Sequence, residues 1–114
     1  YLCRSSRELT VDYITCLGDD PISDRISDFM SDNGIGTSQI KRILGASPGL
    51  YAITTTVEGE RSFTYWRSNS AARQLFADGD FSTLENYDAV YLSGISMAIL
   101  PHSVRLRLLD WLNQ

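Results

Sequence analysis

The sequence predicts an α/β fold, because a strand–turn–helix pattern occurs twice along the chain. In the first unit, the mostly apolar residues 10–17 are followed by Gly18 and by an amphipathic stretch that begins at Pro21. In the second unit, the apolar residues 87–92 precede a helical pattern that Leu100-Pro101 opens. Both runs are apolar with little alternation, which is typical of strands in a parallel sheet covered on both faces. Repeated strand–helix units indicate an α/β architecture.

The elements of the first half follow in order. Residues 1–9 have the pattern of the last part of a helix, with no capping residue at the start. The helix that begins at Pro21 has Asp20 in the capping position, and Asn33-Gly34 is expected to end it. Its apolar residues fall on one stripe, at Ile22, Ile26, Phe29 and Met30. A weaker pattern predicts a strand over residues 39–44, and residues 45–49 are expected to form a loop.

The second half continues after an unusual stretch at 49–67. Residues 68–70 (Ser-Asn-Ser) can cap a short helix over 71–76, and 77–80 break it. Another helical turn is expected over 81–85. The strand at 87–92 is expected to end in a turn at 93–95, and the last helix repeats Val104, Leu108 and Trp111 at i, i+4 and i+7.

The stretch 49–67 predicts a β-hairpin. Two runs rich in Thr, Ile, Tyr, Phe and Trp flank a glycine-containing break. Tyr51, Tyr65, Trp66 and Arg67 give this hairpin flat aromatic area and a forked cation. The aromatic residues are also explained as ordinary cross-strand pairs of a half-buried sheet.

The register of the hairpin decides which side chains share a face. A three-residue loop over 57–59, with glycine in a left-handed conformation at the last position, sets Tyr51 opposite Tyr65 and puts Arg67 on the same face. A two-residue loop over 58–59 turns Tyr51 to the opposite face. We favour the three-residue loop.

The composition limits the partners of the chain. With 114 residues, 43% of them hydrophobic and 21% charged, the chain is one globular domain in length. The net charge of −4, with no cluster of Lys or Arg, argues against nucleic acid. No apolar run approaches the roughly 20 residues of a membrane helix. Cys3 and Cys16 are expected to be free, buried thiols in a reducing compartment, and a disulfide between them is the alternative.

Few residues carry a catalytic signature. Residues 18–20 (Gly-Asp-Asp) and 93–95 (Ser-Gly-Ile) both follow expected strands, where open α/β sheets bind their ligands. A tight turn also explains each of them, and Asp20 is also explained as a helix cap. His102 has no partner at a diagnostic spacing and is expected at the surface. The sequence contains no P-loop motif and no Cys/His metal cluster. The residues alone therefore lead to an α/β protein with an aromatic, arginine-bearing hairpin.

Three segments resemble the ribokinase-like (PfkB) carbohydrate kinases. They are residues 49–51 with 59–67 (Gly-Leu-Tyr and Gly-Glu-Arg-Ser-Phe-Thr-Tyr-Trp-Arg), 91–100 (Tyr-Leu-Ser-Gly-Ile-Ser-Met-Ala-Ile-Leu) and 17–20 (Leu-Gly-Asp-Asp). The first two are specific for the sugar-acid branch of the family, and the third is family-wide. The resemblance implies part of a ribokinase-like three-layer α/β core with a small β-sheet lid.

The same resemblance divides the chain and gives it a function. Residues 1–34 and 71–114 would belong to the core, and 35–70, which include the hairpin, to the lid. The branch transfers the γ-phosphoryl group of ATP, with Mg²⁺, to 2-keto-3-deoxygluconate while the lid closes over the sugar. The alternatives are a sibling kinase for a neutral sugar such as fructose or ribose, and a non-catalytic interaction module built on the lid.

The substrate-binding residues implied by the resemblance are Tyr51, Tyr65 and Arg67, with Ile95 lining the sugar pocket. Arginine offers a bidentate fork to a carboxylate, and tyrosine supplies flat area and a hydroxyl. The expected partner is a small sugar acid, with a possible homo-oligomer through the lid and no nucleic acid or membrane.

The resemblance also implies which motifs of the family lie outside this sequence. The family's Gly-Gly sugar-binding segment would precede Tyr1, while its Asn-x-Arg segment and the Gly-Ala-Gly-Asp-type motif with the general-base Asp would follow Gln114. We therefore expect a fragment from the N-terminal half of a cytoplasmic kinase. Because phosphoryl transfer needs the missing parts, the fragment alone is expected to bind neither ATP nor Mg²⁺ and to be inactive.

Overall fold

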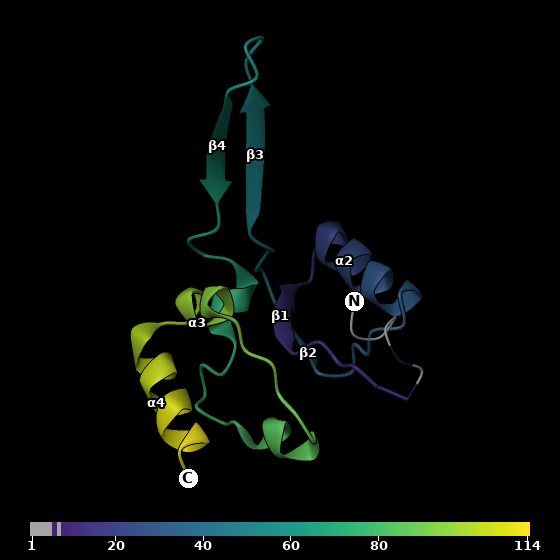
Figure 1. The fold of residues 1–114 in the computed structure, drawn as a ribbon, viewed down its shortest axis with the longest axis vertical. Helices are drawn as coiled ribbons and strands as arrows, with labels where there is room; N and C mark the ends of the chain where they lie inside the picture. Colours follow the sequence, from purple (N-terminus) through teal and green to yellow (C-terminus); the bar gives the residue numbers. More distant parts are fainter. Residues whose placement is uncertain (1–5, 7) are drawn as a thin grey trace.

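The computed structural model describes residue 6 and residues 8–114 (Figure 1). The helices and strands of this part are β1 (Thr15–Gly18), α2 (Pro21–Asp32), β2 (Ile40–Ile43), β3 (Leu50–Thr55), β4 (Arg61–Trp66), the 3₁₀ helices η1 (Ala71–Gln74) and η2 (Ser82–Asn86), α3 (Gly94–Ile99) and α4 (His102–Leu112). None of the helices in this part is long and apolar enough to span a membrane.

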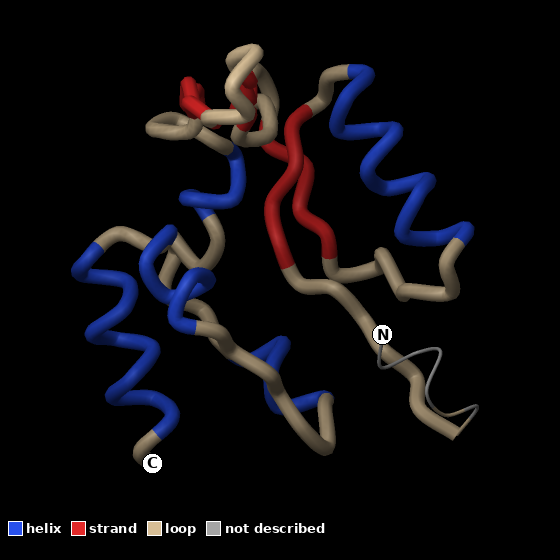
Figure 2. The backbone as a smooth tube through the Cα atoms, turned by 45° about the horizontal axis from the view of Figure 1, so that its top comes forward, coloured by secondary structure: helices blue, strands red, loops and turns tan. Residues whose placement is uncertain are grey.

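The first three elements form a parallel β–α–β unit, which confirms the predicted α/β class. β1 pairs in parallel with β2, with Thr15 opposite Ile40 and Gly18 opposite Ile43, and α2 makes the crossover between them (Figure 2). All four residues of β1 are buried. The strand is shorter than the predicted 10–17, because only one isolated parallel bridge, Asp12 to Gly36, continues the pairing before it among the described residues.

Helix α2 begins and ends where the sequence predicts. The Asp20 carboxylate accepts hydrogen bonds from the backbone N–H groups of Ile22 (2.9 Å) and Ser23 (3.1 Å). After Asn33 the chain reaches Gly34 at φ +75°, a left-handed conformation that suits glycine and stops the helix. The apolar stripe, however, does not face a core within the described residues, because Ile22 is 44% and Phe29 68% exposed.

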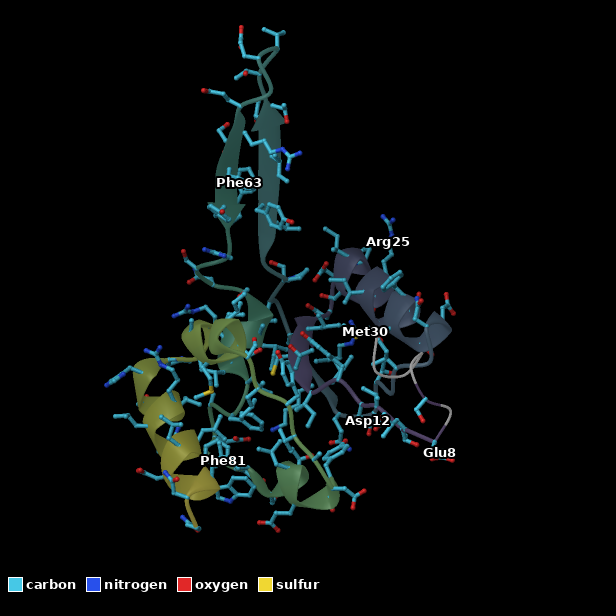
Figure 3. The ribbon with its side chains drawn as sticks, in the orientation of Figure 1. Glu8, Asp12, Arg25, Met30, Phe63 and Phe81 are labelled. Carbon is cyan, nitrogen blue, oxygen red and sulfur yellow. The ribbon has the colours of Figure 1, made fainter. Side chains whose placement is uncertain are left out.

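A second group of elements builds the main apolar core. Six buried side chains form it: Phe76, Phe81, Leu84, Leu100, Val104 and Leu108. The rings of Phe76 and Phe81 meet edge to face with 5.2 Å between their centroids, and the ring of Trp111 lies 6.0 Å from that of Phe81. Figure 3 shows the place of Phe81 in the fold. The predicted stripe of the last helix is thus confirmed, since Val104 and Leu108 are buried and Trp111 packs against the cluster.

The prediction of a buried strand at 87–92 is wrong. Within the described part of the chain this segment belongs to no strand, and Val90 and Tyr91 are 39% and 83% exposed. An apolar run becomes a strand only when the edge of a neighbouring strand offers backbone hydrogen-bond partners in register. Here a side-chain hydrogen bond, and not a backbone ladder, joins the segment to the residues before β1. The Tyr87 hydroxyl donates to the Asp12 carboxylate at 2.7 Å, and this bond raises the pKa of the tyrosine.

The residues after this segment also differ from expectation. The turn predicted at 93–95 opens α3, because the Ser93 hydroxyl accepts from the N–H of Ser96 (3.1 Å) and caps the helix. The short helices predicted at 71–76 and 81–85 are present as the 3₁₀ helices η1 and η2. The helix end expected at 1–9 and the burial of Cys3 fall mainly outside the described residues; Ser6, Glu8 and Leu9 are not helical. Cys16 is buried and free, as predicted.

The hairpin of β3 and β4 projects from the rest of the molecule (Figure 1). Every residue of both strands is exposed. β2, which falls inside the predicted lid range 35–70, pairs with β1 and not with this hairpin. The parallel pairing favours a lid boundary nearer residue 49, and the division into 1–34, 35–70 and 71–114 stays a prediction.

We predict that Leu108→Ala lowers the free energy of unfolding by about 2–5 kcal/mol, the usual cost of truncating a fully buried leucine. Leu108 has 0% exposure at the centre of the main core, so its loss leaves a cavity. The matched control is Leu106→Ala, two positions away on α4 with 50% exposure, which is expected to change stability by about 0.5 kcal/mol or less. Chemical denaturation of both variants measures the difference, and equal losses would contradict the core described above.

Candidate functional site

The register of the hairpin is the one that brings Tyr51 and Tyr65 together. These two residues are direct partners across β3 and β4. The N–H of Thr56 donates to the carbonyl of Glu60 (2.9 Å), and the N–H of Gly59 donates to the carbonyl of Thr56 (3.0 Å). Gly59 has φ +87°, which closes the three-residue loop. The predicted three-residue loop is confirmed, and the two-residue alternative is excluded.

Four side chains on one face of the hairpin, which we call the hairpin cluster, are in contact. They are Tyr51, Phe63, Tyr65 and Arg67. The rings of Phe63 and Tyr65 stack with 6.0 Å between centroids and 10° between planes, and Tyr51 lies 6.1 Å from Tyr65 and 6.3 Å from Phe63. The guanidinium carbon of Arg67 lies 4.3 Å from the centre of the Tyr65 ring, a cation–π contact. Figure 3 shows Phe63 partway along the projecting hairpin.

The cluster is open to solvent rather than covered by other elements. Tyr51 is 62% exposed, Tyr65 50% and Phe63 48%. Neither face of the hairpin is buried against another element, although Tyr51 and Tyr65 form a direct cross-strand pair. Within the described residues the ion pairs are Lys41 with Asp78 and Arg42 with Asp24, and neither involves Arg67.

The arrangement suits a small anionic molecule that carries hydroxyl groups. Stacking of Arg67 on Tyr65 uses the flat face of the guanidinium, and its N–H groups in the plane remain able to make a bidentate pair with a carboxylate. The two phenol hydroxyls can donate to or accept from sugar hydroxyls. One cation and two phenols on one side of a ribbon therefore provide recognition but no nucleophile and no general base.

The fourth expected site residue, Ile95, lies outside the hairpin cluster. It is the second residue of α3 and is 78% exposed. His102 is exposed at the start of α4, as predicted. In the described part of the chain, no group of three or more His, Cys, Asp or Glu side chains is arranged to hold a metal ion.

The Gly-Asp-Asp turn after β1 is occupied by structural hydrogen bonds. The hydroxyl of Ser23 donates to Asp20 Oδ2 (2.7 Å) and accepts from the N–H of Gly18 (2.9 Å). The first of these bonds, with the backbone donors of α2, holds the pKa of Asp20 below its ordinary value. Asp19 Oδ1 accepts from the N–H of Gly45 at 2.9 Å. The turn therefore acts as a cap and an anchor, and the last contact is one that no local pattern could have revealed.

Comparisons with known proteins agree on one family. Residues 5–113 match the family model described as pfkB family carbohydrate kinase. The 2-dehydro-3-deoxygluconokinase of Haemophilus influenzae is 40% identical, over 99% of this chain and 38% of the relative, and that of Dickeya dadantii is 43% identical, over 89% and 34%. A PfkB protein from Polaromonas sp. JS666 superposes with a TM-score of 0.73 at 22% identity, over 91% of this chain and 35% of that one. The chain thus spans about a third of the length of these proteins.

We predict that Asp20→Ala lowers the melting temperature at neutral pH, because the cap of α2 is lost. The folded-state pKa of Asp20 is below its ordinary value, so the carboxylate stabilises the fold above the unfolded pKa of about 3.9, and this contribution is lost as the pH falls through the folded pKa. The difference from wild type should therefore shrink in acid. The measurement is the melting temperature of both proteins from neutral pH down to acid pH. A melting-temperature difference between Asp20→Ala and wild type that does not change with pH would contradict the capping role of the charged carboxylate.

Proposed function

Since this chain belongs to the pfkB family of carbohydrate kinases, we propose that it forms the sugar-binding part of an ATP-dependent kinase that phosphorylates 2-keto-3-deoxygluconate. Its fold is a partial ribokinase-like α/β fold with a separate two-stranded hairpin, and in this proposal the hairpin is the lid. The relatives named above, 40–43% identical, support this substrate. The observation that carries the proposal is the hairpin cluster, because it offers two exposed phenols beside an arginine that forms no ion pair with any described residue.

The residues take distinct roles in this proposal. Arg67 pairs with the carboxylate of the sugar acid, while Tyr51 and Tyr65 contact its hydroxyl groups and cover one side of the chain of carbons. Ile95, exposed on α3, supplies an apolar wall of the sugar pocket. Closure of the hairpin over the sugar would exclude water, which otherwise competes with the sugar for the phosphoryl group.

The nucleotide side of the reaction is not assigned to these residues. ATP and Mg²⁺ are what the family implies, but the sequence has no P-loop and the described residues contain no cluster of acidic or other metal-binding groups. We derive no step through ATP or Mg²⁺ from this chain. In the proposal this chain contributes recognition of the acceptor, and other residues of the kinase contribute positioning and charge neutralisation of the phosphates.

We also propose that the hairpin is the surface through which two copies associate. Its second face carries Leu50 opposite Trp66, which are 44% and 60% exposed, so both faces of the hairpin are apolar in part. A two-stranded hairpin is marginally stable alone and gains from a partner.

The free, buried Cys16 fits a reducing compartment, and we place the kinase in the cytoplasm.

We predict that Arg67→Ala in the full-length kinase raises the KM for the sugar acid about 10- to 100-fold and leaves the KM for ATP within about twofold. The expected size is that of a lost charge-assisted hydrogen-bonded pair. Steady-state kinetics with each substrate varied in turn measures both constants.

The matched control is Arg61→Ala, which removes the same side chain from the other end of β4, about 20 Å along the strand. This control should leave both KM values near those of wild type. Equal effects of Arg67→Ala on the two substrates would defeat the assignment of Arg67 to the sugar acid.

The substrate class has its own test. A panel of 2-keto-3-deoxygluconate, fructose and ribose, offered to the full-length kinase, should give the highest kcat/KM for the acid, because only the acid can pair with Arg67. A preference for a neutral sugar would favour the alternative hypothesis of a sibling kinase that acts on fructose or ribose. Assembly in sedimentation that is indifferent to every sugar, together with no turnover, would favour a non-catalytic interaction module.

A further inference from the structure

We propose that Asp19 is a positioning residue: it fastens the loop at the base of the hairpin to the β1–α2 turn and thereby sets the direction in which the hairpin cluster faces. The inference rests on the proposed function for its consequence in catalysis, but its structural part does not depend on the substrate. It gives a role to an exposed side chain that neither caps α2 nor belongs to the cluster.

The hairpin is attached to the molecule through its two connecting segments. β3 and β4 pack mainly on each other, and the pair extends away from the other elements (Figure 1). With every strand residue exposed, burial gives the hairpin little orientation of its own. Within one copy of the chain, whatever holds the connecting segments therefore decides where the cluster points.

The incoming segment, residues 44–49, lies directly on the turn after β1. The N–H of Gly45 donates to Asp19 Oδ1 at 2.9 Å, a contact between residues 26 positions apart. Beside it, the carbonyl oxygen of Ala46 approaches Gly18 so closely that a Cβ at position 18 would collide with it. Gly45 itself has φ +70°, so the loop turns sharply at the residue that Asp19 holds.

The outgoing segment is fastened to the incoming one. The N–H of Ala71 donates to the carbonyl of Ser47 at 2.9 Å. A Cβ on Gly49 would lie 3.1 Å from the Cβ of Arg67, so the two ends of the hairpin are in close contact at its base. Movement of residues 45–49 is thus transmitted both to β3, which carries Tyr51, and to Arg67.

The turn that carries Asp19 is itself held in place. The guanidinium of Arg42, on β2, donates to the carbonyl of Gly18 (2.9 Å) and pairs with Asp24 on α2 (3.0 Å). The neighbouring Asp20 is engaged in the cap of α2. The carboxylate of Asp19 therefore projects from a fixed point, and its bond to Gly45 is charge-assisted, the stronger kind of hydrogen bond.

The test compares Asp19→Ala with Asp19→Asn, which keeps a carbonyl acceptor, and with the matched control Asp28→Ala, which removes an exposed carboxylate from α2. Hydrogen exchange of the full-length kinase follows the amides of residues 44–49. For Asp19→Ala we expect exchange at Gly45 to be about tenfold faster, on the scale of a charge-assisted hydrogen bond. We also expect a sugar-acid KM raised about 3- to 10-fold, with the ATP KM and kcat little changed. Asp19→Asn should restore at least half of each effect, and Asp28→Ala should match wild type.

Three results would overturn the inference: unchanged exchange at Gly45 in Asp19→Ala, faster exchange with an unchanged sugar-acid KM, or no recovery in Asp19→Asn. Because Asp19 is exposed, its variants should fold, and thermal unfolding checks that they do. A wild-type kinase without activity on any sugar acid would defeat the proposed function instead. The exchange measurement would then still decide whether Asp19 anchors the hairpin.

Discussion

The left-handed conformation of Gly59 is the constraint on which the candidate site depends. Because Gly59 closes a three-residue loop, Tyr51 is paired with Tyr65 and shares its face with Arg67. Side chains alternate across a strand, so a shift of one residue would send Tyr51 to the opposite face and separate the two phenols. The hairpin has no buried face to enforce a register, and the loop conformation together with the aromatic contacts supplies it.

The features that sequence reasoning predicted are those set by neighbours in the chain. Asp20 and Pro21 mark the start of α2, Asn33-Gly34 its end, and the spacing of Val104 and Leu108 gives the buried side of α4. Each depends on residues within about two helical turns. The strand expected at 87–92 shows the opposite case, since an apolar run does not reveal whether a neighbouring strand offers its edge. Ser93 is a further example: it could close a turn or cap a helix, and here it caps α3.

In the candidate site, too, the features set by residues close in the chain could be predicted, and those set by distant residues could not. Tyr51, Tyr65 and Arg67 could be grouped in advance because the hairpin loop is a local signal with few registers. The resemblance to carbohydrate kinases added Ile95, which the structure places on a separate helix. The link from Asp19 to Gly45 was beyond sequence reasoning, since it joins residues on either side of a β–α–β crossover and leaves no periodic pattern. The exposure of Ile22 and Phe29 on the α2 stripe was also unexpected, because periodicity gives a face but not the element that packs against it.

Because the hairpin is exposed, ligand recognition and folding stability depend on different residues of this chain, whereas the two properties compete in many proteins. Its strand residues bury little surface, whereas the main core lies around Phe81 and Leu108. Substitutions in the cluster therefore alter recognition at little thermodynamic cost to the remainder of the fold. Ligand preference on such a ribbon can therefore change without a large loss of folding stability.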